Sequence, residues 1–315
     1  MGPASGAGPD MTKLRRGYAM VAVSFVVMGS IGAVVDWAQA PASMLVVLRM
    51  GIGALVLAAV FARRPMLAEI RRPGIPRLLL AMGAIDAVTL LLFFSSVRMT
   101  NVAIAMFLLF LSPLWVALLA PPILGAKTDR IVWPAFGIAL AGLACIIVPP
   151  ALGDELDLSL LGVIAALLSG IGLAGFMMTV NALRARGVRS ATIVIVEGAL
   201  DVLILLPLAI WQTWVTGSGL TGRDIVAGLF LGTVCTAFAY LLLTEGMGFI
   251  PVQHVPILGY LEPLAAPLYA FVLVGETPGA WTLIGGLFIV GAGTLLVLRG
   301  NAAGTEEALA ELPVP

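Results

Sequence analysis

Long apolar stretches, separated by short polar connections, dominate this sequence and restrict the folds that it can adopt. A helix that crosses a bilayer needs about 20 mostly apolar residues. Ten segments approach or meet that length, at residues 17–37, 41–62, 77–97, 101–120, 131–148, 159–183, 190–211, 224–247, 252–274 and 280–298. None alternates polar and apolar residues as barrel strands do, and a lone strand leaves its backbone unpaired in lipid. The sequence therefore predicts an all-α membrane protein with ten transmembrane helices.

Composition and charge agree with a membrane protein. Only 11% of the residues are charged, against about 25% in soluble domains. The 17 basic and 17 acidic residues balance, which argues against nucleic acid as a partner. Most Lys and Arg fall on one side if both tails, 1–16 and 300–315, are cytoplasmic, as the positive-inside rule requires. The acidic loop around Asp154 then faces outward, and we expect a multi-pass protein of the cell inner (plasma) membrane.

Several kinds of chemistry lack their usual sequence signals. Cys145 and Cys235 both lie in apolar segments, where a packing role is expected rather than a disulfide or a metal site. The chain has no P-loop pattern, no H-E-x-x-H pair and no G-x-S-x-G elbow. We therefore expect no cofactor, no metal and no catalytic residue.

A repeat relates the two halves of the chain. Residues 108–126 align without a gap to residues 258–276, and seven of the nineteen positions match. Proline matches are rare by chance in such a composition, and Pro113 pairs with Pro263. Five helices per half is an odd number, so the second half must enter the membrane from the opposite side. This predicts an inverted-topology repeat of residues 17–150 and 151–299, a common architecture of secondary transporters.

The repeated motifs carry a family resemblance over residues 17 to 299. They are Leu111-Ser112-Pro113, Leu261-Glu262-Pro263 followed by Gly275-Glu276, and the pair Arg49-Met50 in the second segment. With them the chain resembles the EamA-type transporters of the drug/metabolite transporter superfamily. One departure is Gly125-Ala126-Lys127, where that family usually has Gly-Glu. The resemblance implies export of small metabolites such as amino acids through a central cavity lined by the first, third, fourth, sixth, eighth and ninth segments.

Acidic residues within apolar segments are the candidate substrate-binding groups. An ionisable side chain at the bilayer centre costs roughly 2.5 to 3.5 kcal/mol and by default marks a site or an ion pair. Asp86 and Glu262 lie near the middle of the third and ninth segments, so we expect them to bind substrate or to carry protons. The alternatives are an Asp86–Arg49 ion pair and a structural Glu262 satisfied by neighbouring donors.

Arg49 lies at the depth expected for Asp201, which favours a structural ion pair between them. Glu197 is four residues from Asp201 and so shares its helix face. These two carboxylates could instead form a proton relay.

Further residues complete the predicted site. Tyr260, Phe107 and Trp37 are candidate substrate contacts, and His254 and Glu245 are candidates for proton coupling at the inner side. Pro263 cannot donate a backbone hydrogen bond, so Pro113, Pro263 and Gly259 are the predicted hinge.

Two functions follow from this pattern. The favoured one is a secondary transporter, an exporter of small organic metabolites that works by alternating access as a monomer or homodimer. The alternative is a polytopic membrane enzyme acting on a lipid-linked substrate. An enzyme would gather its acids near one membrane face, whereas the acids here are spread in depth, which favours transport.

Overall fold

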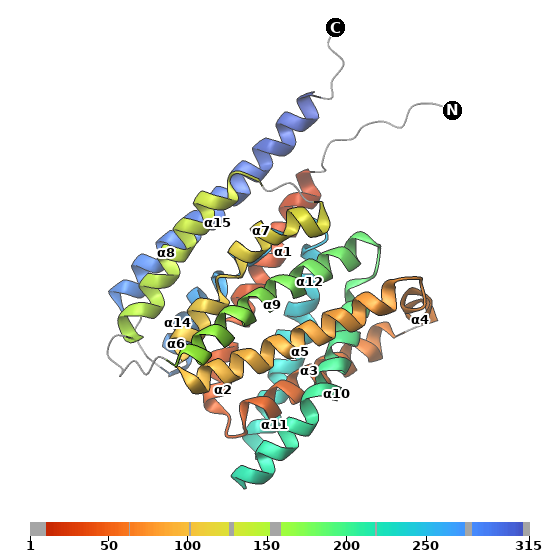
Figure 1. Ribbon diagram of the computed structural model, residues 1–315, viewed down its shortest axis with the longest axis vertical. Coiled ribbons are helices and arrows are strands. Elements are labelled where there is room, and N and C mark those ends of the chain that lie inside the picture. Colours follow the sequence, from red (N-terminus) through yellow and green to blue (C-terminus); the bar gives the residue numbers. More distant parts are fainter. Residues whose placement is uncertain are drawn as a thin grey trace.

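The computed structural model describes residues 11–62, 64–100, 102–125, 129–151, 159–217, 219–274 and 279–310. Every regular element within these ranges is helical (Figure 1). The helices of the first half of the chain are α1 (Met11–Met28), α2 (Ile31–Trp37), α3 (Ala42–Phe61), α4 (Arg64–Ile70), α5 (Ile75–Met99), α6 (Val102–Leu109), α7 (Ser112–Leu124) and α8 (Val132–Ala151). The second half contains α9 (Leu160–Ala185), α10 (Ser190–Thr216), α11 (Gly222–Phe230), the π-helix η1 (Leu231–Tyr240), α12 (Leu241–Gly246), α13 (Val255–Leu258), α14 (Leu261–Val274) and α15 (Ala280–Ala310).

Eight helical stretches are long and apolar enough to cross a membrane. They are Met11–Val35, Ala42–Phe61, Ile75–Met99, Ile104–Leu124, Leu160–Ala185, Ser190–Thr216, Gly222–Gly246 and Ala280–Leu298. These coincide with eight of the ten predicted segments. Val132–Val148 is a shorter apolar helix, and the segment at 252–274 consists of the two short helices α13 and α14. The chain is therefore a multi-pass, all-helical membrane protein, while the number ten stays a prediction.

Three of the predicted membrane segments are broken in the middle. The breaks lie at Gly29-Ser30 between α1 and α2, at Phe110-Leu111 between α6 and α7, and at Gly259-Tyr260 between α13 and α14. Pro113 and Pro263 fall in the first turns of α7 and α14, where a missing backbone N–H costs little. The prolines thus start new helices, and each break precedes its proline by two or three residues.

The first break packs closely against the third. A Cβ added to Gly29 would lie 2.6 Å from the Cβ of Ala265 and 2.8 Å from the backbone oxygen of Glu262. Such distances are too short for a side chain larger than hydrogen, so this crossing requires glycine. The contact holds the middle of the first membrane segment against the start of α14.

The helices pack in pairs that join the two halves of the chain. α3 packs against α10, α5 against α9, and α8 against α15; α1 contacts η1, α12 and α14, whereas α9 contacts α6 and α7. Figure 1 shows α8 and α15 side by side along one edge of the molecule. One apolar core is formed by α1, α5, α9, η1 and α12, and a second lies among α8, α15 and the breaks at Phe110 and Tyr260. Large apolar side chains such as Leu55, Trp214 and Leu287 are exposed, as expected for lipid-facing helices.

Candidate functional site

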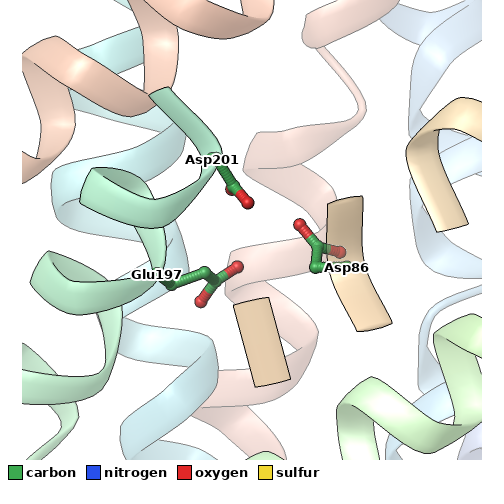
Figure 2. Close-up of side chains that lie close together, drawn as sticks. All are labelled: Asp86, Glu197 and Asp201. Carbon is green, nitrogen blue, oxygen red and sulfur yellow. The ribbon is translucent and has the colours of Figure 1, made fainter. Parts of the chain in front are cut away.

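Three carboxylates meet in the interior of the helix bundle. Asp86 comes from α5, and Glu197 and Asp201 come from successive turns of α10. One oxygen from each lies within 4.8 Å of the other two, and Figure 2 shows the three side chains turned toward one another. We call Asp86, Glu197 and Asp201 the acidic cluster. It brings together Asp86, a predicted substrate-binding residue, with Glu197 and Asp201. For these two carboxylates a proton relay was the alternative to an ion pair with Arg49.

The acidic cluster is short of hydrogen-bond donors. Tyr240 Oη donates to Glu197 Oε1 at 2.7 Å, but Glu197 Oε2 and both oxygens of Asp201 are buried without a donor. An oxygen of Asp201 lies within 4.8 Å of one of Asp86, and two carboxyl groups can hydrogen-bond only if one of them carries a proton. Asp201 is 0% exposed and Glu197 1%, whereas Asp86 is partly exposed. The cluster therefore needs positive charge that its hydrogen bonds do not provide.

Arg49 is the positive charge associated with the cluster. It interacts electrostatically with all three of its carboxylates. Its Nε, however, donates to Thr236 Oγ1 at 3.0 Å, and no nitrogen of Arg49 lies within 4.0 Å of an Asp201 oxygen, so the predicted direct ion pair is not formed in this structure. The physical reason is the close approach of η1 to α3: Gly53, one turn after Arg49, lets Thr236 come so near that an added Cβ would lie 2.5 Å from its Cγ2.

Two residues around the cluster were not found by sequence reasoning. Thr236 and Tyr240 both lie on η1, where the π-helical winding widens the turn. Their spacing of four residues matches that of Glu197 and Asp201 on α10. That match is the only sequence signal for them, and it is a weak one because hydroxyl residues are common in membrane helices.

Glu262 lies in the first turn of α14, half-buried, where the helix dipole favours a negative charge. It interacts electrostatically with Arg49 and with Cys235 of η1. Arg49 is thus the common electrostatic partner of both predicted substrate carboxylates, Asp86 and Glu262. The structure records no direct contact between those two carboxylates.

The three aromatic candidates occupy different environments. Tyr260 is fully buried and donates from its hydroxyl to the backbone oxygen of Phe110 at 2.5 Å. Phe107 is partly buried against the second core. Trp37 is 47% exposed, and the guanidinium of Arg223 lies 5.7 Å from its ring centroid. Only Tyr260 therefore makes a hydrogen bond that joins two of the broken segments.

His254 lies at the end of the bundle that carries the α12–α13 connection. Its Nδ1 is 2.5 Å from the hydroxyl of Tyr18, and its Nε2 is 4.0 Å from Asp129. Glu245 pairs with Arg184 at 3.0 Å and accepts from Ser190 at 2.5 Å. Both candidates for proton coupling thus have partners at one end of the molecule, away from the acidic cluster.

Glu69, on α4, is a second buried carboxylate at that end. Arg189 Nε donates to it at 2.6 Å and Thr192 Oγ1 at 2.7 Å. Burial alone would raise the pKa of Glu69, but the hydrogen bonds from Thr192 and Arg189 outweigh it and hold the pKa below its usual value. The side chain is 6% exposed and its charge is satisfied within the chain.

A cavity of about 420 Å³ opens at the opposite end of α10. Its lining consists of Met44, Ile210, Thr213, Trp214, Gly217 and Gly219. No predicted site residue is among them, and Ile210 lies nine residues beyond Asp201, about 13 Å along the helix. This cavity does not reach the acidic cluster.

Comparison with known proteins assigns the chain to a family. The model of the EamA-like transporter family matches residues 15–148 and 160–299. The chain belongs to the EamA-like transporter family. Both stretches match the same model, and together they cover most of the chain.

Relatives of this EamA-like transporter carry transporter names. An "Uncharacterized transporter" of Archaeoglobus fulgidus is 29% identical over 287 residues, which cover 91% of this chain and 97% of the relative. The "Pseudopaline exporter CntI" of Pseudomonas aeruginosa is 25% identical, over 88% of this chain and 94% of the exporter. A solved crystal structure with 19% identity superposes with a TM-score of 0.72 and covers 91% of this chain and 98% of its own, so it shares the fold. This EamA-like protein is therefore a membrane transporter of the drug/metabolite type rather than an enzyme.

Proposed function

We propose that this protein is a secondary exporter of small organic metabolites such as amino acids, and that it works by alternating access. Membership of the EamA-like family supports transport, and the name of the relative CntI supports export. The observation that carries the proposal is the pair of partly buried carboxylates Asp86 and Glu262, both of which interact electrostatically with a single arginine, Arg49. Charged groups at such depth are costly and are typical of substrate or ion pathways.

The proposed architecture is two inverted five-helix halves, residues 17–150 and 151–299, in ten spans. The packing supports it, because exchanging the first five spans for the last five turns the most extensive helix contacts into one another. The contact of α5 with α9 becomes that of α12 and η1 with α1, and the contact of α1 with α14 becomes that of α9 with α6 and α7. The contacts of α3 with α10 and of α8 with α15 are their own counterparts. Both termini are proposed to be cytoplasmic, in the inner (plasma) membrane.

Within this frame Asp86 and Glu262 bind the substrate, and an amino group would offer the complementary charge. Tyr260, Phe107 and Trp37 are proposed as further substrate contacts. The breaks before Pro113 and Pro263 are the proposed flexible points, together with Gly259. Their position in the middle of matched segments is where a rocking motion of the halves would need the helices to bend.

Proton coupling is proposed for Glu262 and Asp86, with His254 and Glu245 acting at the inner end. His254 joins Tyr18 of α1 to the segment before α13, so a change in its charge would act on a contact between the two halves. The transporter would work as a monomer or homodimer in the bilayer.

Flux measurements in proteoliposomes test the proposal. Labelled amino acids are followed in both directions with the wild type, Asp86→Asn and Glu262→Gln. Each substitution removes a carboxylate charge and keeps the side-chain shape, so we expect each to lower flux at least tenfold. Glu306→Gln, in the C-terminal part of α15 beyond the apolar stretch, is the matched control and should transport normally. Unchanged flux in both Asp86→Asn and Glu262→Gln would remove the assigned site.

A further inference from the structure

We propose that Asp86, Glu197 and Asp201 form a binding site for a hard divalent cation of about the size of Ca²⁺ or Mn²⁺. The three side chains converge from two helices, and their nearest oxygens lie within 4.8 Å of one another (Figure 2). Two oxygens on opposite sides of a Ca²⁺ ion are about 4.6 to 5.2 Å apart, from Ca–O distances of about 2.3 to 2.6 Å. Carboxylate oxygens are also the ligands that such cations prefer.

The unpartnered oxygens point to a ligand independently of the convergence. Asp201 is fully buried, and neither of its oxygens receives a hydrogen bond from any nitrogen or hydroxyl donor. Glu197 is fixed through Oε1 by Tyr240, which leaves Oε2 buried and without a donor. A buried carboxylate without a partner is strongly unfavourable. Both side chains nevertheless turn into the cluster rather than away from it (Figure 2).

The charges of the surrounding groups define the valence of the missing ligand. Three carboxylates and one arginine leave two negative charges in a low-dielectric interior. Arg49 comes from α3 and holds Thr236 through its Nε, while Tyr240 of η1 is a neutral donor to Glu197. Glu262 of α14 also interacts with Arg49. The positive charge of Arg49 is therefore shared between Glu262 and the cluster. One divalent cation makes the cluster and Arg49 neutral together.

The geometry also indicates from which side the cation would enter and what its binding would do to the helices. Asp86 is the partly exposed member of the cluster, so an ion would enter from its side. Once bound, the ion would tie α5 to α10, which belong to opposite halves of the chain. The cation would therefore stabilise one arrangement of the halves, whatever solute the protein carries.

Calorimetric titration of the purified, full-length protein in detergent tests this inference. The protein is stripped with EDTA, dialysed, and titrated with CaCl₂ and MnCl₂. We expect one site per chain in the wild type and an affinity at least tenfold weaker in Glu197→Gln and in Asp201→Asn, since each loses a ligand. Glu69→Gln is the matched control: it also removes a buried carboxylate, but one that pairs with Arg189 and Thr192 outside the cluster, and it should bind with unchanged affinity.

A second measurement guards against variants that fold poorly. Addition of Ca²⁺ should raise the thermal unfolding temperature of the wild type, because a ligand of the folded state stabilises it, and should leave that of Asp201→Asn unchanged. Equal binding by the wild type and both cluster variants would overturn the inference. So would a wild type that binds neither cation and instead shows, in infrared spectra at neutral pH, a protonated carboxyl band that Asp201→Asn removes, since protons would then neutralise the cluster.

The experiment is independent of solute transport. Cation binding in a protein that moves no amino acid would contradict the proposed export and leave the site intact. Export by a protein that binds no cation would contradict the cation site and leave the proposed export intact.

Discussion

Two buried carboxylates, Glu69 and Asp201, show how differently the same chain treats the same chemical group. Glu69 is 6% exposed and Asp201 0%, so both have left bulk solvent. Glu69 receives hydrogen bonds from Arg189 and Thr192. Asp201 receives none from a nitrogen or hydroxyl and faces other carboxylates.

The difference teaches how to distinguish a structural acid from a ligand-binding one. A buried charge with its donors in place is satisfied within the chain, and removing one partner is strongly destabilising. A buried charge without them costs stability unless something outside the chain completes it. Burial is nearly equal at the two sites, so the supply of donors separates them. On this criterion Glu69 is structural, and the acidic cluster is the proposed ligand site.

The largest expected effect follows from removing Arg49. Arg49→Gln takes away the positive charge that interacts with the acidic cluster and with Glu262. Loss of one partner from a buried charge set costs roughly 3 to 5 kcal/mol, so we expect little folded protein in EDTA by size-exclusion chromatography. The double variant Arg49→Gln/Asp201→Asn should recover part of the loss. A single variant as stable as the wild type would mean that Arg49 does not balance the cluster.

The comparison of the two acids predicts substitutions of opposite sign. Glu69→Gln replaces a charged acceptor of two hydrogen bonds and should lower the free energy of unfolding by about 1 to 3 kcal/mol. Asp201→Asn removes an uncompensated charge, so in EDTA it should leave the stability unchanged or raise it. Thermal unfolding of both variants under identical detergent conditions measures the contrast. Destabilisation of equal size in both would erase the distinction drawn here.

The pH dependence of stability sharpens the Glu69 side of the comparison. Because the pKa of Glu69 is lower in the folded protein, its contribution is fully present above the unfolded value of about 4.3 and is lost as the pH falls through the folded pKa. The stability difference between the wild type and Glu69→Gln should therefore shrink below about pH 4.3. Unfolding temperatures recorded from neutral pH downward provide the test, and a constant difference would contradict the role of the ionised group.

The sequence predicted the helices better than the site, for a physical reason. Apolar length alone locates a membrane helix, so the segments that carry Arg49, Asp86 and Asp201 were found as single helices. The prolines at 113 and 263 also indicated broken segments, although the breaks precede them. Which side chains meet depends on how neighbouring helices are rotated and how closely they approach. The hydropathy of a single sequence specifies neither the rotation of the helices nor the distance between them.

The predicted ion pair illustrates this limit. Depth along the helices suggested that Arg49 and Asp201 lie at the same level in the membrane, and the two interact electrostatically. The π-helical winding of η1 and the close approach at Gly53 then gave Arg49 a different direct partner, Thr236. Asp86 of α5 also lies beside Asp201 of α10, a neighbour that its sequence position did not indicate.

The smallest expected effect follows from removing the hydroxyl of Tyr260. This substitution should affect packing but not ligand binding. The Tyr260 hydroxyl donates to the backbone oxygen of Phe110, which lies at the break between α6 and α7. Tyr260→Phe leaves that buried oxygen without its donor and should cost about 1 kcal/mol, read as a small drop in the unfolding temperature.

Calcium affinity should not change in Tyr260→Phe, because this hydroxyl contacts no member of the acidic cluster. Tyr240→Phe is the natural counterpart, since its hydroxyl donates to Glu197 and orients that carboxylate for a cation. It should weaken calcium binding. If the two variants changed affinity equally, the effect would come from general loosening of the bundle, and the acidic cluster would lose its claim to a built site.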